Sequence, residues 1–157
     1  MLGITIGDEP FPHLLFHCRL PYSRWETVSI AFVEDFASFA DDFSRAMRQL
    51  ESVPAEHRTD NLQAVTHAEG DRRVFNQRWS DFMDHYGVKP STNNPGMRHE
   101  NGSVEKSHDL IYKTLDQLLR LRGSRNFASR TDYEMFLQGV IDRRNWWRSN
   151  TTAAGQR

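Results

Sequence analysis

The feature that most constrains the fold is a change in hydrophobic period after the first thirty residues. Before it, β-branched and aromatic residues form short runs at Leu14–Leu20 and Thr27–Phe32, which is typical of β-strands. After it, apolar residues recur at steps of three and four, the stripe of an amphipathic helix: Phe36, Phe39, Ala40, Phe43, Met47 and Leu50. Strands followed by a helix that can cover them indicate an α/β domain.

Three further segments complete the expected sheet. Leu2–Ile6 is a strand pattern that begins almost at the first residue, so the first strand is expected to be truncated. Together with the two runs above it would form three antiparallel N-terminal strands, and Glu56–Asp60 and Val88–Asn93 would add two short strands. We therefore expect a mixed five-stranded sheet flanked by helices.

The rest of the chain predicts helices separated by loops. A second helix is marked by Phe75, Trp79, Phe82, Met83 and Tyr86 and ended by Gly87. A third runs from Val104 to near Gly123 with Ser103 as its cap, and a fourth from Thr131 to Trp147. Thr66–Arg73 and the stretch from Asn93 to Gly102 are predicted loops. Residues 1–148 would be one domain, and 149–157 a disordered tail.

Composition limits the class of protein. A chain of 157 residues with 38% apolar and 11% aromatic content can bury one real core. The single Cys18 excludes an intramolecular disulfide framework and a multi-cysteine zinc site, so a reducing cytoplasm is expected. The apolar runs are too short to span a bilayer, so no membrane association is predicted.

Charge is segregated along the sequence. Residues 1–105 carry ten Lys/Arg and sixteen Asp/Glu, a net −6, whereas residues 106–157 carry ten and five, a net +5. A basic C-terminal third could lie along a nucleic-acid backbone. The alternative is that these arginines are solvated helix faces and helix C-terminal charges.

Two carboxylates suggest the chemistry. Asp60 would end a strand and Glu105 would stand in the first turn of a helix, an arrangement that commonly builds two-metal phosphoryl-transfer sites. The competing interpretation is that Glu105 only complements the helix dipole. Glu100 in the predicted loop is a weaker ligand candidate, and Asp8 fits a turn better than a site.

The histidines and the C-terminal tryptophans each carry two interpretations. The seven histidines lack the spacing of a zinc site; His99 and His108 could approach a scissile phosphate or simply be packed polar residues. Trp146 and Trp147, beside several arginines, could stack on bases, but the end of a buried amphipathic stripe is the favoured explanation.

Several motifs, in order, resemble the core of IstA-type insertion-sequence transposases, a branch of the retroviral-integrase (DDE) superfamily. They cover nearly the whole chain: Tyr22-Ser23-Arg24-Trp25-Glu26, His57-Arg58-Thr59-Asp60-Asn61-Leu62, Asn93-Asn94, His99-Glu100-Asn101-Gly102-Ser103-Val104-Glu105, Arg122-Gly123-Ser124-Arg125 and Arg143-Arg144-Asn145. An ordered series of this kind is far more specific than any one of its motifs.

The resemblance implies a ribonuclease-H-like fold and metal-dependent DNA strand transfer, as in transposition and DNA integration. It places metal-binding, catalytic carboxylates at Asp60 and Glu105, with Mg²⁺ or Mn²⁺ as cofactor, and DNA contacts at Arg122, Arg125, Arg143 and Arg144. Implied partners are transposon-end and target DNA, further copies of the chain and an ATPase helper protein. The family's first catalytic Asp would lie before Met1, so strand transfer by this chain is expected to be impaired.

Two other functions remain open. The chain could be a non-catalytic DNA-binding or assembly fragment of a disrupted transposase, which would keep the basic surface without turnover. It could instead be a ribonuclease-H-like nuclease that hydrolyses DNA rather than joining it. Reaction products distinguish the nuclease, because a nuclease leaves nicks and a transposase leaves joined ends.

Overall fold

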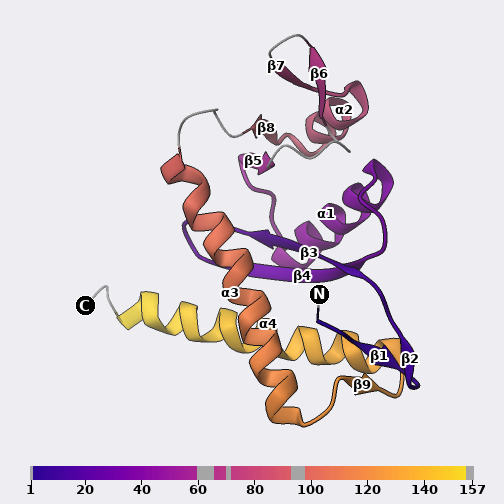
Figure 1. Ribbon diagram of the computed structural model, residues 1–157. Helices are drawn as coiled ribbons and strands as arrows, with labels where there is room; N and C mark the ends of the chain where they lie inside the picture. The colour runs from indigo at the N-terminus through magenta and orange to yellow at the C-terminus, as the bar shows by residue number, and fades with distance from the viewer. Residues whose placement is uncertain (1, 60–65, 70–71, 93–97, 155–157) are drawn as a thin grey trace. The chain divides into compact units, whose positions relative to one another are not determined.

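The computed structural model describes residues 2–59, 66–69, 72–92 and 98–154 (Figure 1). They form two compact units: residues 1–32 with 104–157, here called the hairpin unit, and residues 33–103, here called the aromatic unit. Strands and helices alternate, and the strands pair both in parallel and antiparallel, which confirms the predicted α/β class. None of the helices in the described ranges is long and apolar enough to cross a bilayer.

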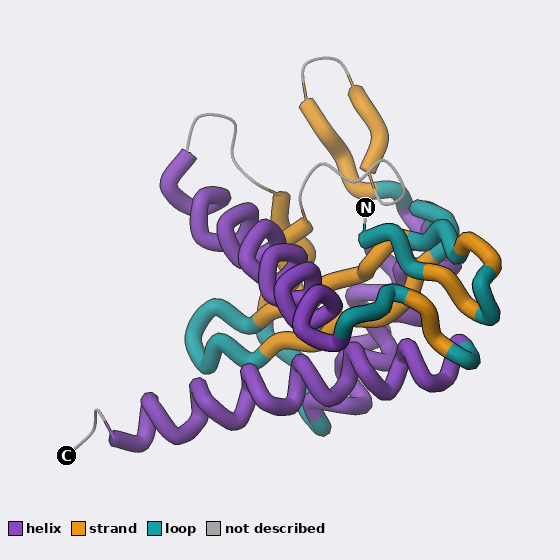
Figure 2. The backbone as a smooth tube through the Cα atoms, turned by 60° about the horizontal axis from the view of Figure 1, so that its bottom comes forward, coloured by secondary structure: helices purple, strands orange, loops and turns teal. Residues whose placement is uncertain are grey.

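The hairpin unit is named after its longest pair of strands, β3 (Leu14–Arg19) and β4 (Glu26–Ala31). They pair antiparallel over six residues each, from Leu14 opposite Ala31 to Arg19 opposite Glu26 (Figure 2). Their apolar and β-branched residues predicted both strands. The turn between them is closed by the backbone N–H of Leu20, which donates to the carbonyl oxygen of Trp25 at 2.8 Å.

A small second sheet holds the start of the chain. Its order is β2 (Glu9–Pro10), β1 (Thr5–Ile6) and β9 (Asn126–Phe127), with β1 antiparallel to β2 and parallel to β9. Gly7 and Asp8 turn the chain back with φ angles of 58° and 67°. Asp8 therefore occupies a turn, as expected.

The strand pairing differs from the single five-stranded sheet that the sequence predicted. Among the described residues the strands form four separate ladders, and the first strand is paired with β2 and β9 rather than with β3. The tight turn after Ile6 explains this, because it reverses the chain within two residues and supplies β1 with a local partner.

Two long helices complete the hairpin unit. The helix α3 (Arg98–Arg122) begins six residues before Val104, so the predicted loop is wrong for residues 98–102 and the cap at Ser103 is wrong. The start of that predicted loop, residues 93–97, lies outside the described residues. A helix of this length can propagate through one glycine at a cost of about 1 kcal/mol, which the buried apolar stripe further along outweighs. The helix α4 (Arg130–Ala154) continues to Ala154, where a disordered tail was predicted from residue 149.

The core of the hairpin unit is mainly aliphatic. Sheet, hairpin and helices all contribute to it, and its buried residues are Leu2, Ile4, Val28, Ile30, Ile111, Leu115, Leu119, Phe127, Tyr133, Leu137, Val140 and Ile141. The hydroxyl of buried Tyr133 is hydrogen-bonded to the Nε2 of His13, 2.9 Å away. The apolar stripes read from the sequence thus form one continuous interior.

The aromatic unit contains α1 (Phe36–Leu50), α2 (Gln77–Tyr86) and the parallel pair β5 (Glu56–Thr59) and β8 (Lys89–Thr92). All four elements were predicted within two residues. Each helix has a side-chain cap: Asp35 accepts from the N–H of Ser38 at 2.8 Å, and Asn76 accepts from the N–H of Trp79 at 2.9 Å.

A hairpin replaces the loop predicted at Thr66–Arg73. It consists of β6 (Thr66–Glu69) and β7 (Arg72–Phe75), paired antiparallel. The strand pattern in a sequence depends on alternating apolar residues, which this polar stretch lacks. An antiparallel ladder requires only backbone donors and acceptors, so no side-chain pattern predicted this hairpin.

The interior of the aromatic unit consists largely of rings. His57 packs edge-on against three of them, with centroid distances of 5.8 Å to Phe39, 5.0 Å to Phe43 and 5.6 Å to Trp79. Phe36, Phe82 and Tyr86 extend the same cluster. Ring pairs are favourable in this edge-to-face geometry, because the positive edge of one ring meets the negative face of the next.

Candidate functional site

The two predicted metal-binding carboxylates follow different elements. Asp60 comes next in sequence after Thr59, the last residue of β5, and itself lies outside the described residues. Thr59 is paired with Thr92 of the parallel strand β8, so both strands end at the same edge. Loops at such an edge commonly hold the site of an α/β domain.

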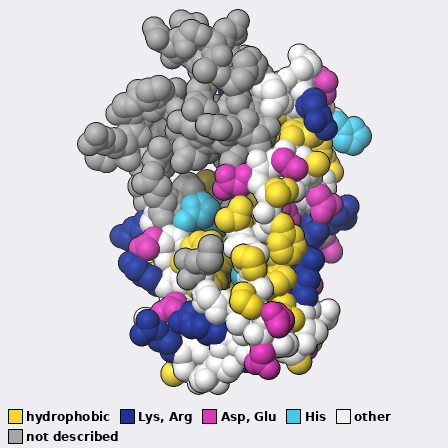
Figure 3. Space-filling model, turned by 45° about the vertical axis from the view of Figure 1, so that its right-hand side comes forward, with side chains coloured by type: hydrophobic (Ala, Val, Ile, Leu, Met, Phe, Trp, Pro, Cys, Tyr) yellow, Lys and Arg dark blue, Asp and Glu magenta, His cyan; other side chains and the backbone are white. Residues whose placement is uncertain are grey.

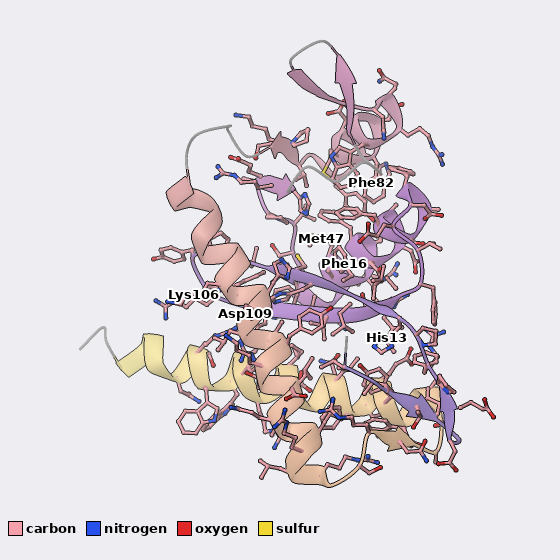
Figure 4. The ribbon with its side chains drawn as sticks, viewed as in Figure 1. His13, Phe16, Met47, Phe82, Lys106 and Asp109 are labelled. Carbon is pink, nitrogen blue, oxygen red and sulfur yellow. The ribbon has the colours of Figure 1, made fainter. Side chains whose placement is uncertain are left out.

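Glu105 lies on α3, and its side chain is outside the described part of the chain. The backbone places it about two turns after the helix begins at Arg98, not in the first turn as predicted. The dipole effect falls off within the first turn, so the interpretation that Glu105 only complements the helix N-terminus loses its basis. Figure 4 shows Lys106 and Asp109, its neighbours on α3.

A divalent cation is the cofactor that suits these two residues. Carboxylate oxygens are hard ligands of the kind that Mg²⁺ prefers, and Mg²⁺ commonly uses one or two protein carboxylates together with water and phosphate oxygens. Among the described residues, no group of three His, Cys, Asp or Glu side chains could hold a metal ion. The donor chemistry of Asp60 and Glu105 therefore fits a magnesium-type site.

Two of the arginines predicted to contact DNA are engaged within the protein. Arg122 donates to the carbonyl oxygens of Ser124 and Asn126 at 2.8 and 2.9 Å and lies over the Phe127 ring. Arg125 bonds Asp116 and the carbonyl oxygen of Leu2, each at 2.5 Å. Both side chains fasten the end of α3 to the segment around β9.

The other two predicted DNA contacts lie on α4. Arg144 is largely buried and bonds Glu26 and Thr114, whereas Arg143 is exposed and its Nε donates to the carbonyl oxygen of Gly139. On the face shown in Figure 3, Lys and Arg side chains are interspersed with Asp and Glu. The basic C-terminal third is thus partly neutralised within the fold.

Trp146 and Trp147 do not end the buried stripe of α4. They are 61% and 67% exposed, and their rings contact each other with centroids 5.4 Å apart. The favoured explanation from the sequence, core packing, is therefore wrong for both residues.

A buried ionic network joins the hairpin to α4, and the sequence did not point to it. Glu26 is fully buried, and its carboxylate contacts Arg144, Arg148 at 2.8 Å and the Nε2 of His17 at 3.1 Å. Asn145 clamps the backbone of Glu26, accepting from its N–H at 2.9 Å and donating to its carbonyl oxygen at 2.8 Å. A single glutamate in a strand pattern gives no signal of its partners on α4, because they are more than one hundred residues away.

The network keeps Glu26 ionised. Burial alone would raise the pKa of this carboxyl, but the hydrogen bonds from His17 and Arg144 and the charges of Arg144 and Arg148 outweigh it and lower the pKa to about 2.

The aromatic unit instead buries a base, His57, in its neutral form. Desolvation lowers the pKa of His57 to about 4, so that histidine is neutral near pH 7.

The network continues from His17 to α3. Because the carboxylate of Glu26 accepts, the Nε2 of His17 carries the hydrogen. In neutral His17 the Nδ1 is then an acceptor, so the Nδ1 of His108, 3.0 Å away, donates to it. His17 thus links Glu26 to α3, and His108 has the packed polar role that was one of its two interpretations.

Comparison with known proteins agrees with this architecture. No protein-family model matches the sequence. The catalytic core domain of the HTLV-2 integrase, solved in complex with magnesium in a dimeric form, aligns over 71% of this chain and 63% of its own, with a TM-score of 0.53 and 22% identity. A chain of the simian T-cell lymphotropic virus intasome, solved in complex with the PP2A regulatory subunit B56 gamma, aligns over 74% of this chain and 38% of its own, with a TM-score of 0.58 and 14% identity.

The chain has the fold of a retroviral integrase catalytic core. This is a ribonuclease-H-like fold, as the resemblance implied. A sequence relative is the uncharacterized protein y4jA/y4nE/y4sE of Sinorhizobium fredii, 33% identical over 147 residues, which are 92% of this chain and 29% of that protein. The chain therefore spans less than a third of that relative's length.

Proposed function

We propose that this chain is the catalytic-core portion of an IstA-type DNA transposase, a polynucleotidyl transferase that joins DNA ends to a target. The observation that carries the proposal is the integrase-core fold, in which the two carboxylates of the transposase motifs follow β5 and lie on α3. The domain would extend over residues 1–148.

Each carboxylate has a defined task in this proposal. Asp60 and Glu105 would hold Mg²⁺ or Mn²⁺, which when bound supplies Lewis-acid stabilisation of the phosphoryl-transfer transition state. A magnesium complex is known for the structural neighbour with a TM-score of 0.53. Two protein carboxylates hold such a cation only weakly, because Mg²⁺ usually keeps several waters, so we expect weak cation binding and low joining yields.

The partners follow from the same proposal. Transposon-end and target DNA would be the substrates, and the chain would self-associate and act with an ATPase helper in the cytoplasm. Arg143 is exposed and suits a phosphate contact, whereas Arg122, Arg125 and Arg144 would act on DNA indirectly, by fixing the surface on which it lies.

An end-joining assay tests the function. The 157-residue protein is incubated with Mn²⁺, a labelled pre-cut DNA end and a plasmid target, and the products are separated on a denaturing gel. We expect joined products in low yield that disappear in Asp60→Asn and Glu105→Gln but persist in Asp41→Asn, a matched change at an exposed carboxylate.

The other outcomes identify the two alternative functions. Nicked plasmid without joined ends would indicate a ribonuclease-H-like nuclease. Retention of DNA without any covalent product would indicate a non-catalytic DNA-binding or assembly fragment. Joined products that survive both carboxylate substitutions would contradict the roles of Asp60 and Glu105.

A further inference from the structure

Four arginines lie at the turn end of the β3–β4 hairpin. Arg19 is the cross-strand partner of Glu26, and Arg144 and Arg148 both contact the Glu26 carboxylate from α4. The guanidinium of Arg148 also donates to the carbonyl oxygen of Arg24 at 2.7 Å. The hairpin turn and the C-terminal half of α4 therefore form one rigid assembly within the hairpin unit.

This assembly carries more positive than negative charge. Its four arginines outnumber its one carboxylate, because Arg144 and Arg148 contact Glu26 while Arg19 and Arg24 stand on the hairpin beside it. The arginines act on one another: burial and the charges of Arg148, Arg24 and Arg144 lower the pKa of Arg19, and only Glu26 opposes them. By contrast, two exposed arginines elsewhere in the hairpin unit have acidic partners: Arg120 with Asp116 at 2.9 Å and Arg130 with Glu134 at 2.8 Å.

Two donors of the assembly lack acceptors. The Nε of Arg19 and an Nη of Arg144 are buried and have no hydrogen-bond partner among the described residues. The oxygens of Glu26 are already taken by Arg144, Arg148 and His17. A buried donor without an acceptor costs about 1–3 kcal/mol, so such groups commonly indicate a missing water or anion.

The assembly is open to solvent on one side. Arg24 is exposed, in a left-handed conformation with φ 59°, and Arg19 is half-buried. The side chains of Arg144 and Arg148 are 15% and 19% exposed. An anion that reached Arg19 and Arg24 would meet a charge field that the buried arginines reinforce.

We infer that the Arg19–Arg24–Arg144–Arg148 cluster is a phosphate anchor for the DNA backbone, with Arg19 and Arg24 making the contacts and Glu26 holding Arg144 and Arg148 behind them. The ligand class is a phosphodiester, because guanidinium groups bind phosphate oxygens in bidentate fashion and carry no sequence information at the backbone. The inference rests on the proposed function for the identity of the polyanion. It assigns DNA contact to residues on the β3–β4 hairpin, within the part of the sequence whose net charge is negative.

Salt dependence of DNA binding tests the anchor. Affinity for a fluorescent 30-base-pair duplex is measured by anisotropy from 50 to 250 mM salt for the unmodified protein and for Arg19→Gln/Arg24→Gln. Each phosphate contact contributes about 0.9 to the slope of log K against log [salt], so the double variant should lose about 2 from that slope. Inorganic phosphate should compete with the duplex for the unmodified protein and compete less for the variant.

Two further variants make the result specific. Arg120→Gln/Arg130→Gln removes the same charge from arginines that already have carboxylate partners and should change the slope by less than the first variant. Arg19→Lys/Arg24→Lys keeps the charge and should restore most of the slope, which a merely structural role for these arginines would not do. Far-ultraviolet circular dichroism confirms that each variant is folded.

The outcomes separate the anchor from the proposed function. Equal slopes for the unmodified protein and the Gln variant overturn the anchor, even if joining activity is present. Asp60→Asn should abolish joining, while the salt slope of its DNA binding stays equal to that of the unmodified protein. That result would support the anchor. Failure of the folded, unmodified protein to bind DNA would overturn both.

Discussion

Each unit of the molecule buries a titratable residue, but one residue is charged and the other is neutral. The hairpin unit buries Glu26 as a charge and surrounds it with arginines from a distant helix. The aromatic unit buries His57 as a neutral ring among Phe39, Phe43 and Trp79. An ionised group can be buried when enough partners converge on it, whereas an isolated base loses its charge.

This difference has a consequence for function. The ionic network of the hairpin unit fixes long side chains on a surface rich in arginine, as recognition of a polyanion requires. The rings of the aromatic unit pack beneath β5 and so support the strand that precedes Asp60. One unit would thus present DNA-binding charge, and the other a rigid platform for a metal-binding carboxylate.

The largest effect is expected from removal of the buried carboxylate. Glu26→Ala leaves Arg144 and Arg148 without their acceptor, and breaking a buried ion pair from one side costs about 3–5 kcal/mol. Urea unfolding should report that loss. Hydrogen exchange should show it first in β3, β4 and α4, with the amides of α1 and α2 less affected.

Two companion variants sharpen that result. Glu134→Ala removes an exposed carboxylate paired with Arg130, and it should cost less than about 1 kcal/mol. Replacing Glu26 and Arg144 together by Met should recover part of the stability lost in Glu26→Ala, because no unpaired charge of that pair remains. Equal losses in Glu26→Ala and Glu134→Ala would contradict a buried network.

The second prediction uses pH to perturb the other unit. The pKa of His57 is lowered from 6.5 to about 4, so its stabilising contribution is complete above pH 6.5 and is lost as pH falls towards 4. Between pH 8 and pH 5 this amounts to about 2 kcal/mol. His57→Phe should remove that part of the pH dependence of the unfolding free energy. An unchanged pH profile would mean that His57 is solvated.

Glu26 responds in a different pH range. Its pKa is lowered from 4.5 to about 2, so its contribution persists down to pH 4.5 and is lost only below that value. Acid should therefore weaken the aromatic unit before the hairpin unit. Hydrogen exchange at pH 5 and pH 3.5 would reveal the order.

The amount of structure predictable from sequence also differs between the units. In the aromatic unit, α1, β5, α2 and β8 were predicted from apolar spacing and turn residues, which are local signals. The hairpin β6–β7 was missed because its ladder depends on backbone groups alone. Local patterns determine helices well and polar hairpins poorly.

In the hairpin unit the strands β3 and β4 and the core stripes of α3 and α4 were predictable, but the roles of charged residues were not. Arg122, Arg125 and Arg144 look alike in sequence to arginines that bind DNA, yet all three are engaged within the protein. Arg122 bonds nearby carbonyl oxygens, and Arg125 and Arg144 bond partners that only folding brings near. For the same reason, the sequence did not predict the buried ionic network of Glu26. The positions of Asp60 and Glu105 came from a family resemblance, which no periodicity could supply.

The third prediction concerns a helix cap. Asn76 accepts a hydrogen bond from the N–H of Trp79 at 2.9 Å, and Asn76→Ala should destabilise the protein by about 1 kcal/mol. Asn76→Asp should be close to neutral, since aspartate caps equally well. A loss of comparable size in both variants would exclude capping as the cause.

The smallest effect is expected at the surface of α3. Lys113 and Asp109 form an exposed pair at 2.6 Å, four residues apart on the helix. Lys113→Ala should change the unfolding free energy by about 0.5 kcal/mol or less, and the change should shrink further in 0.5 M salt. A salt-independent change well above 1 kcal/mol would show that this pair is not a surface interaction.

The central claim is that Asp60 and Glu105 bind one divalent cation together. Titration with Mn²⁺, followed by electron paramagnetic resonance, measures free and bound cation in the unmodified protein, Asp60→Asn, Glu105→Gln and the double variant. The account predicts one weak site that both single variants lose to the same extent, with no further loss in the double variant. Undiminished Mn²⁺ binding in both single variants would contradict it.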